Sequence, residues 1–561
     1  MNSLPPLKRA SYILHVVTVA GIARHTSNTP SLDVLPLVRL LDEVLALFDT
    51  EPRFQHFVLD GQSIFLEDYL SIRPETFERI EALVQDGRLL VGPWYVQTDP
   101  ISVSVESLIR NLMIGLRTAR VFGPPMRVAY MPYASELVPA LPQIFKDFGI
   151  EVALAPNRIA GEPLERIWEG DDGTRIPLAA LPDGVATLDH SIVDRRSAAA
   201  PYSDSGHLLL LYVWDKSESY QYRLNWLYSL PAAQRELHDS VFHSHPAAYA
   251  KAIETNARAT PPPVIQSSPT QEAELQQSRP TLRAERAIRF QLEPFAAWIE
   301  NLPARDEDRH LRHPQQMIQK LWRGYLELLS PAPLQNHSDA TEPDIEEKKQ
   351  LELIRSASEL AWRAQMSLAA RVNTALLAAN GGTEQGILLV VFNPNEHAAI
   401  VSVPDALAHL IEFETQEIPP FGYTSLVALY VNPSAEADQQ VHAALDLLRN
   451  DVDNALAFHI EGIHDGELRP SASVMSVSEA GFHLSVIKLP EEADRTGIIV
   501  RGWNVGETPL WIVLTPWRTF STVEVVTLDE SPTGGKLAPE PNGAVRFKAA
   551  PHRILTFWFH D

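Results

Sequence analysis

The chain has 561 residues, enough for three or four domains, and its formal net charge is −24, from 71 acidic and 47 basic residues. This excess of negative charge argues against nucleic acid as a partner. Because the sequence has no cysteine, disulfides, thiolate chemistry and cysteine metal sites are excluded. No apolar run approaches the ~20 residues of a membrane helix, so we expect no membrane partner and a cytoplasmic location, with secretion as the alternative.

The first apolar run extends from Tyr12 to Ala23 and follows Lys8 and Arg9. It fits either a signal peptide or a buried first strand, YILHVVTV, of an α/β domain. We favour the strand, because His15 interrupts the apolar run and the motifs downstream need a strand here. Further strand-like runs lie at 54–60, 88–92, 127–131, 150–155 and 207–213.

Amphipathic helices alternate with these strands. Apolar residues recur at helical spacing from Val34 to Phe48. Pro74 can open a second helix that ends before Gly87, and a third helix begins near Ser104. This alternation predicts a mostly parallel, barrel-like α/β domain over residues 1–260, with functional residues at the carboxyl ends of the strands.

The pattern then changes twice along the chain. Residues 261–282 are rich in Pro, Gln and Ser and indicate a linker, and residues 283–382 have the periodicity of a helical bundle. Short strands separated by turn residues such as Asn393-Pro394 predict a β-sandwich region over residues 383–561. The predicted fold class is therefore multidomain, with an α/β domain, then α, then β.

The stretch GRLLVGPWYVQTDPISVSVESLIRNLMIG, residues 87–115, carries the clearest chemical signal. A short strand leads into Trp94 and Tyr95, and a polar turn carries Asp99. Aromatic rings stack on sugar faces and a carboxylate accepts hydrogen bonds from hydroxyls. These three residues are therefore candidate sugar-binding residues. The alternative is that the two rings pack in the core and the acid caps a turn.

This stretch resembles glycoside hydrolase family 38, the α-mannosidase family, as do LDGQSIFLEDYL at 59–70 and VVFNP at 390–394. The resemblance covers most of the chain in the right order and implies the same succession of α/β, helical and β regions. It also implies that Arg158 and Asp215 line the sugar cleft. The chain resembles a shortened member, because the segment from about 430 to 475 leaves little room for the family's large β-supersandwich.

The resemblance also implies a catalytic apparatus. The family holds one zinc ion by a His-x-Asp pair after the first strand, an Asp after the fourth strand and a His in the helical region. The Asp after the fourth strand is also the nucleophile of a retaining reaction. At these positions the present chain has Gly21 and Ala23 for the His-x-Asp pair and Tyr133 for the nucleophile. Glycine and alanine offer no side-chain ligand.

The fourth ligand position falls in the helical region. Counting without gaps places Leu334 there, whereas a small shift places His337 or Asp339 there instead. A tyrosine is the nucleophile in some sialidases, where a base activates it. Glu136, three residues after Tyr133, is the candidate base, although the simpler interpretation is that Tyr133 fills the pocket.

One histidine pair outside these motifs could also bind a metal. His243 and His245 stand at i, i+2, but two histidines alone make a weak site, so we predict an ordinary surface pair.

We therefore expect a family-38-like protein without intact catalytic residues and without a cofactor, which binds a carbohydrate. One alternative is an active retaining α-mannosidase-type hydrolase with an altered zinc site. Another is a structural or interaction protein with a closed cleft. The oligomeric state is left open.

Overall fold

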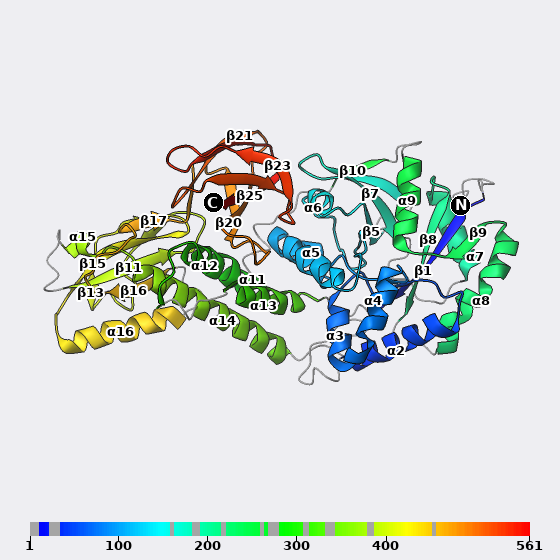
Figure 1. Ribbon diagram of the computed structural model, residues 1–561, viewed down its shortest axis with the longest axis horizontal. Coiled ribbons are helices and arrows are strands. Elements are labelled where there is room, and N and C mark those ends of the chain that lie inside the picture. Colours follow the sequence, from blue (N-terminus) through cyan, green and yellow to red (C-terminus); the bar gives the residue numbers. More distant parts are fainter. Residues whose placement is uncertain are drawn as a thin grey trace, which may run out of the picture. The chain divides into compact units, whose positions relative to one another are not determined.

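The computed structural model describes residues 11–21, 34–156, 162–181, 191–214, 220–257, 263–266, 280–306, 314–330, 343–378, 386–450 and 456–561. The chain forms two compact units: Met1–Ser278 with Leu326–Lys348, and Arg279–Tyr325 with Lys349–Asp561. Figure 1 shows the elements of the first unit in blue to green and those of the second in green to red. No helix in the described ranges is both long and apolar enough to cross a membrane.

The first unit alternates strands with helices. Its strands are β1 (Ile13–Ala20), β2 (Phe57–Val58), β3 (Leu89–Leu90), β4 (Val128–Tyr130), β5 (Val152–Pro156), β6 (Glu165–Glu169), β7 (Arg175–Leu181), β8 (His207–Trp214), β9 (Ser240–His243) and β10 (Val264–Gln266). Its helices are α2 (Leu35–Thr50), α3 (Ile64–Ile72), α4 (Phe77–Gln85), α5 (Val105–Arg120), α6 (Leu141–Asp147), α7 (Ile192–Ala199), α8 (Tyr220–Leu237) and α9 (Pro246–Ala257).

These strands form two mostly parallel sheets that share one core. The first sheet has the order β3-β2-β1-β8, and β9 also pairs with the first half of β1. The second has the order β10-β6-β7-β5-β4, in which only β6 and β7 are antiparallel. The backbone N–H of Met126 donates to Val91 O at 2.9 Å and joins the sheets between β3 and β4. Val17, Val58 and Leu154 lie in the same hydrophobic cluster.

Local signals explain the helices that flank the site. Gly87 has φ +68° just past α4, where a residue with a side chain would be strained. The Ser104 hydroxyl accepts from Ser107 N at 3.0 Å and caps α5. The first apolar run is the buried strand β1, which confirms the strand interpretation.

The later part of the chain contains α11 (Pro280–Arg286), a π-helix at Ala287–Leu292, α12 (Glu293–Glu300), α13 (Pro314–Glu327), α14 (Pro343–Ala369), α15 (Ala375–Ala378) and α16 (Ala435–Asn450). Its strands are β11 (Gly386–Asn393), β12 (Ala399–Val401), β13 (Ile411–Glu412), β14 (Gln416–Ile418), β15 (Gly422–Tyr430), β16 (Ala457–Glu461), β17 (Ser471–Ser473), β18 (Met475–Val477), β19 (Phe482–Lys488), β20 (Ile498–Asn504), β21 (Leu510–Pro516), β22 (Thr522–Val526), β23 (Pro532–Leu537), β24 (Val545–Ala549) and β25 (Ile554–His560).

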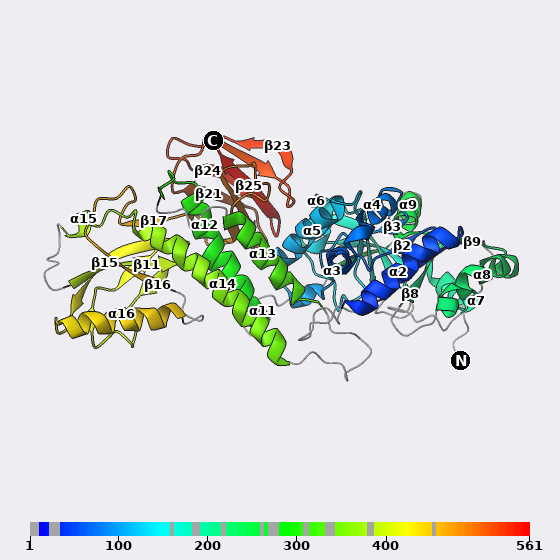
Figure 2. The same cartoon turned by 60° about the horizontal axis from the view of Figure 1, so that its bottom comes forward.

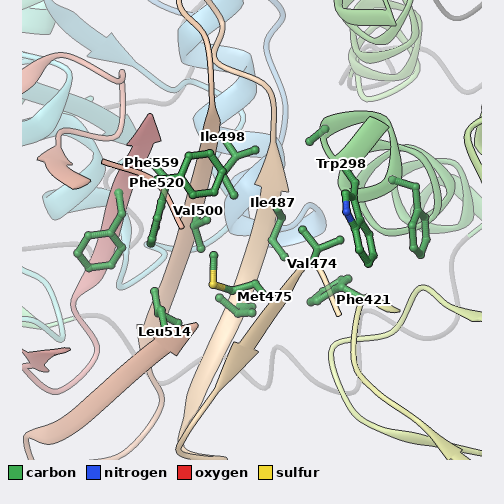
Figure 3. Close-up of a cluster of buried hydrophobic side chains, with 14 of the residues drawn as sticks. Trp298, Phe421, Val474, Met475, Ile487, Ile498, Val500, Leu514, Phe520 and Phe559 are labelled. Carbon is green, nitrogen blue, oxygen red and sulfur yellow. The ribbon is translucent and has the colours of Figure 1, made fainter. Parts of the chain in front are cut away.

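The second unit packs antiparallel sheets against helices. Its five-stranded sheets have the orders β13-β15-β11-β16, with β17 beside β15, and β19-β20-β25-β22-β23. Trp298 of α12 belongs to the same hydrophobic cluster as Met475 and Phe559, and Figure 3 shows these side chains between helix and strands. Figure 2 shows the helices and strands of this unit from a second side. Helix α16 packs apolar side chains such as Val441 on the sheet of β11. The predicted multidomain fold class is confirmed.

Candidate functional site

The candidate site lies where β1, β2, β3 and β4 end. In an open parallel sheet the carboxyl ends of the strands are where ligands bind. Gly21 follows β1, Asp60 follows β2, the segment from Pro93 to Asp99 follows β3, and Tyr133 follows β4. By the family resemblance, Gly21 and Tyr133 stand at two zinc positions, so their surroundings decide whether a metal fits.

Gly21 has no space for a side chain. A Cβ built on its backbone would lie 2.2 Å from Cγ1 of Val213, which belongs to the neighbouring strand β8. The backbone is held there, because Gly21 N donates to Trp214 O at 2.8 Å. An imidazole at residue 21 would therefore require β8 or its Val213 side chain to move.

Tyr133 is half-buried and lies beside a buried acid. Asp60 is only 2% exposed and its carboxylate accepts from Gln62 Nε2 at 2.7 Å. Burial raises the pKa of Asp60 well above its usual value, although the Gln62 hydrogen bond opposes the shift. The charge of Asp60, followed by burial, raises the pKa of the Tyr133 phenol well above its usual value. The raised pKa favours the protonated phenol, so Tyr133 is not prepared to act as an anionic nucleophile.

The acid that acts on Tyr133 is not the one expected from the sequence. Glu136, the candidate base, is exposed, whereas Asp60 is the charge that dominates the pKa of the phenol. Asp60 was not among the candidate site residues predicted from the sequence. It directly follows the strand-like run FQHFVL, and a polar residue after a strand was the signal used for the other candidates.

Trp94 is part of the framework beneath these residues. Its ring is 2% exposed and lies edge-on to Phe145, with centroids 5.9 Å apart. Its Nε1 donates to Tyr130 O at 3.2 Å. Gln97 Nε2 donates to the same carbonyl at 2.9 Å and to Asp60 O at 2.8 Å. The segment after β3 thus joins the ends of β2 and β4.

Tyr95 is likewise enclosed. It is 1% exposed, and its hydroxyl donates to Glu67 Oε2 of α3 at 2.9 Å. The side-chain amide of Asn111 in α5 serves the backbone here, because its Oδ1 accepts from Tyr95 N and Val96 N at 2.8 and 3.0 Å. The aromatic pair expected to stack on a sugar therefore packs inside the unit, which matches the alternative of core packing.

Asp99 fixes one loop to another. Its carboxylate accepts from Ser135 N at 3.0 Å and from the Ser135 hydroxyl. The acid proposed to bind sugar hydroxyls thus holds the segment that carries Tyr133. Ala23, Arg158, Asp215, Leu334, His337 and Asp339 lie outside the described residues.

The described residues contain no group of three or more His, Asp or Glu side chains that could hold a metal ion. The prediction of a surface pair at His243 and His245 was wrong for His243. This residue is 5% exposed, and its ring lies 4.9 Å from that of Trp226. It is buried because β9 pairs with β1 at residues 240–243.

Comparisons with known proteins bear on the family of the N-terminal region and on the fold of the chain. Residues 35–270 match the model of the glycosyl hydrolases family 38 N-terminal domain. A segment of 155 residues is 36% identical to a protein of Halalkalibacterium halodurans named "Putative mannosylglycerate hydrolase", and it covers 25% of this chain but only 17% of that relative.

Two solved structures share the fold along the chain. An α-mannosidase from Enterococcus faecalis V583 aligns with a TM-score of 0.75 at 13% identity, over 98% of this chain and 100% of that one. A glycosyl hydrolase family 38 protein from Enterococcus faecalis aligns with a TM-score of 0.71 at 13% identity, over 99% and 100% of the two chains. Residues 35–270 are thus similar to the N-terminal domain of glycosyl hydrolases family 38, and the chain shares the fold of these two solved structures.

Proposed function

We propose that this protein is a member of family 38 that has lost zinc-dependent glycoside hydrolysis and binds a mannoside without cleaving it. The observation that carries the proposal is the contact between the Cβ position of residue 21 and Val213 at 2.2 Å. A metal ligand at residue 21 requires β8 or the Val213 side chain to move, and Tyr133 replaces the nucleophilic carboxylate expected from the family.

The proposed loss removes two contributions to catalysis, the charge of the zinc ion and the covalent route. Without the zinc, the charge that orients the sugar hydroxyls is missing. Without a carboxylate, the covalent route is missing, and the raised pKa of Tyr133 opposes its use as a substitute. Support for binding comes from the relatives, which are named as acting on mannosides, and from the half-buried Tyr133 at the strand ends.

A second candidate is a structural or interaction protein with a closed cleft. It is favoured by the burial of Trp94 and Tyr95 and by the bonds that hold Asp99. An active hydrolase with an altered zinc site is the outcome that would overturn both.

The test combines metal analysis, turnover and binding on the full chain. We expect substoichiometric zinc after purification, no release of nitrophenol from an aryl α-mannoside with or without added zinc, and saturable binding of methyl α-mannoside. A Tyr133→Phe variant is the matched control, because it removes only the phenolic oxygen. Tightly held zinc near one equivalent together with turnover contradicts the proposal, and absent binding with no turnover favours the closed cleft.

A further inference from the structure

The second unit contains a cavity that the proposed function does not use. Its volume is about 220 Å³, and it lies between the segment before β12 and the strands β18 and β19. This is well over ten times the ~10–15 Å³ that one water needs. Its lining includes Glu396, Met475, Glu479, Phe482 and His483. A small organic molecule can therefore enter it.

A carboxylate and an imidazole are held together at the wall of this cavity. Glu396 Oε2 lies 2.6 Å from His483 Nδ1, and both side chains are 24% exposed. Burial acts to raise the pKa of Glu396, but the hydrogen bond from His483 and the nearby charges of His483, His397 and Arg289 lower it overall. Because a carboxylate only accepts, Nδ1 of His483 donates in this contact.

The lining selects against anions. No lysine or arginine lies among the described residues that line the cavity. The nearby Arg289 is already engaged, since it donates to Ser485 O at 2.5 Å, to Ser485 Oγ at 3.1 Å and to Glu285 at 3.1 Å. A ligand must instead supply several donors to the two glutamates.

The floor of the cavity is apolar. Met475 and Phe482 line it and are 0% and 4% exposed. Figure 3 shows Met475 within the hydrophobic core of the unit. A ligand with hydroxyls on one side and C–H groups on the other matches both surfaces, since adjacent hydroxyls can donate to the two oxygens of one carboxylate.

From this geometry we propose that the cavity around Glu396 and His483 is a binding site for a neutral polyhydroxy molecule of the size of a single sugar ring. Glu396 and Glu479 accept from its hydroxyls, His483 lies beside them, and the apolar wall formed by Phe482, with Met475 in the core of the unit, faces its C–H groups. This site is independent of the strand-end site in the first unit.

The test uses methionine methyl groups as local reporters. The chain has 7 methionines, so ¹³C-methyl spectra of the labelled full-length protein are simple, and Met475→Leu assigns the reporter of the cavity. Met131, two residues before Tyr133, reports the strand-end site in the same spectrum. Methyl α-mannoside, glucose, galactose and glycerol are the probes, and ethanolamine tests for a cationic ligand.

We expect the Met475 signal to shift saturably with at least one sugar. Glu396→Ala and His483→Ala should raise the dissociation constant about tenfold or more, because each removes a charge-assisted or fixed hydrogen bond. Glu414→Ala, at an exposed position outside the cavity, should leave it unchanged. Thermal unfolding of both cavity variants verifies that they fold.

The proposal is overturned if no sugar moves Met475, if only ethanolamine does, or if both cavity variants bind as the wild type does. A shift of Met131 without one of Met475 places sugar binding in the first unit alone, so failure of this inference is distinguishable from failure of the proposed function.

Discussion

Acid should destabilise the first unit through a buried histidine cluster, and His15 is the residue through which this can be measured. His15 is 3% exposed; its Nδ1 lies 2.9 Å from Ser244 Oγ and its Nε2 lies 3.0 Å from His207 Nδ1. Burial, and then the charges of His207 and His245, lower its pKa from 6.5 to about 4. Two facing ring nitrogens 3.0 Å apart can share one proton but cannot both carry one.

The sign of the effect follows from this direction. The unfolded chain binds a proton at His15 below pH 6.5, whereas the folded chain does so only near pH 4. The contribution of neutral His15 is therefore complete above pH 6.5 and is lost as the pH falls toward 4. A shift of this size corresponds to about 3 kcal/mol in full, of which about 2 kcal/mol is lost at pH 5.

The perturbation is His15→Phe, which keeps an aromatic ring and removes the titration. Urea-dependent hydrogen exchange of peptides that contain β1 gives the free energy of unfolding of the first unit at pH 8 and pH 5. We expect the difference between the two pH values to shrink by about 2 kcal/mol in the variant. The exposed His409→Phe serves as a control and should retain the wild-type difference. Equal pH dependence in wild type and His15→Phe would refute the reasoning.

Three further substitutions test the framework. Gly21→Ala should lower the free energy of unfolding, measured by urea titration, by about 1–3 kcal/mol, because the new Cβ meets Val213. In the control Gly462→Ala nothing lies within 4 Å of the new Cβ, so the free energy of unfolding should stay nearly unchanged. Asn111→Leu should cost about 3 kcal/mol or more, since it strips hydrogen bonds from the buried backbone at Tyr95 and Val96; an unchanged melting temperature would contradict this role. Lys488→Met should cost about 3–5 kcal/mol, because Glu530, 3% exposed, then loses its cation, and Lys488→Arg should recover part of the loss in calorimetry.

Much of the fold could be predicted because its signals are local. Gly87 and Ser104 mark helix ends through their own backbone or side chain, and both stand where the sequence placed them. The apolar run that forms β1 could be distinguished from a signal peptide only with the help of the motifs downstream, which require a strand at this place.

The roles of the site residues depended on partners distant in the chain. An aromatic residue after a strand can face a cleft or the core, and Tyr95 faces the core because Glu67 accepts its hydroxyl and Asn111 accepts its backbone N–H. His243 could not be placed without knowing that β9 pairs with β1. Arg158 and Asp215 stay predictions.

Under the proposed function, the contact between residue 21 and Val213 also sets the order in which a zinc site could be built by engineering. Introducing histidine first would meet a steric barrier before any benefit from metal binding arose. Shortening Val213 to alanine removes the Cγ1 atom that blocks the way, so that change must precede or accompany it. Under the proposed function, a return of the zinc site therefore requires an adjustment of β8 at Val213 in addition to the new ligands themselves.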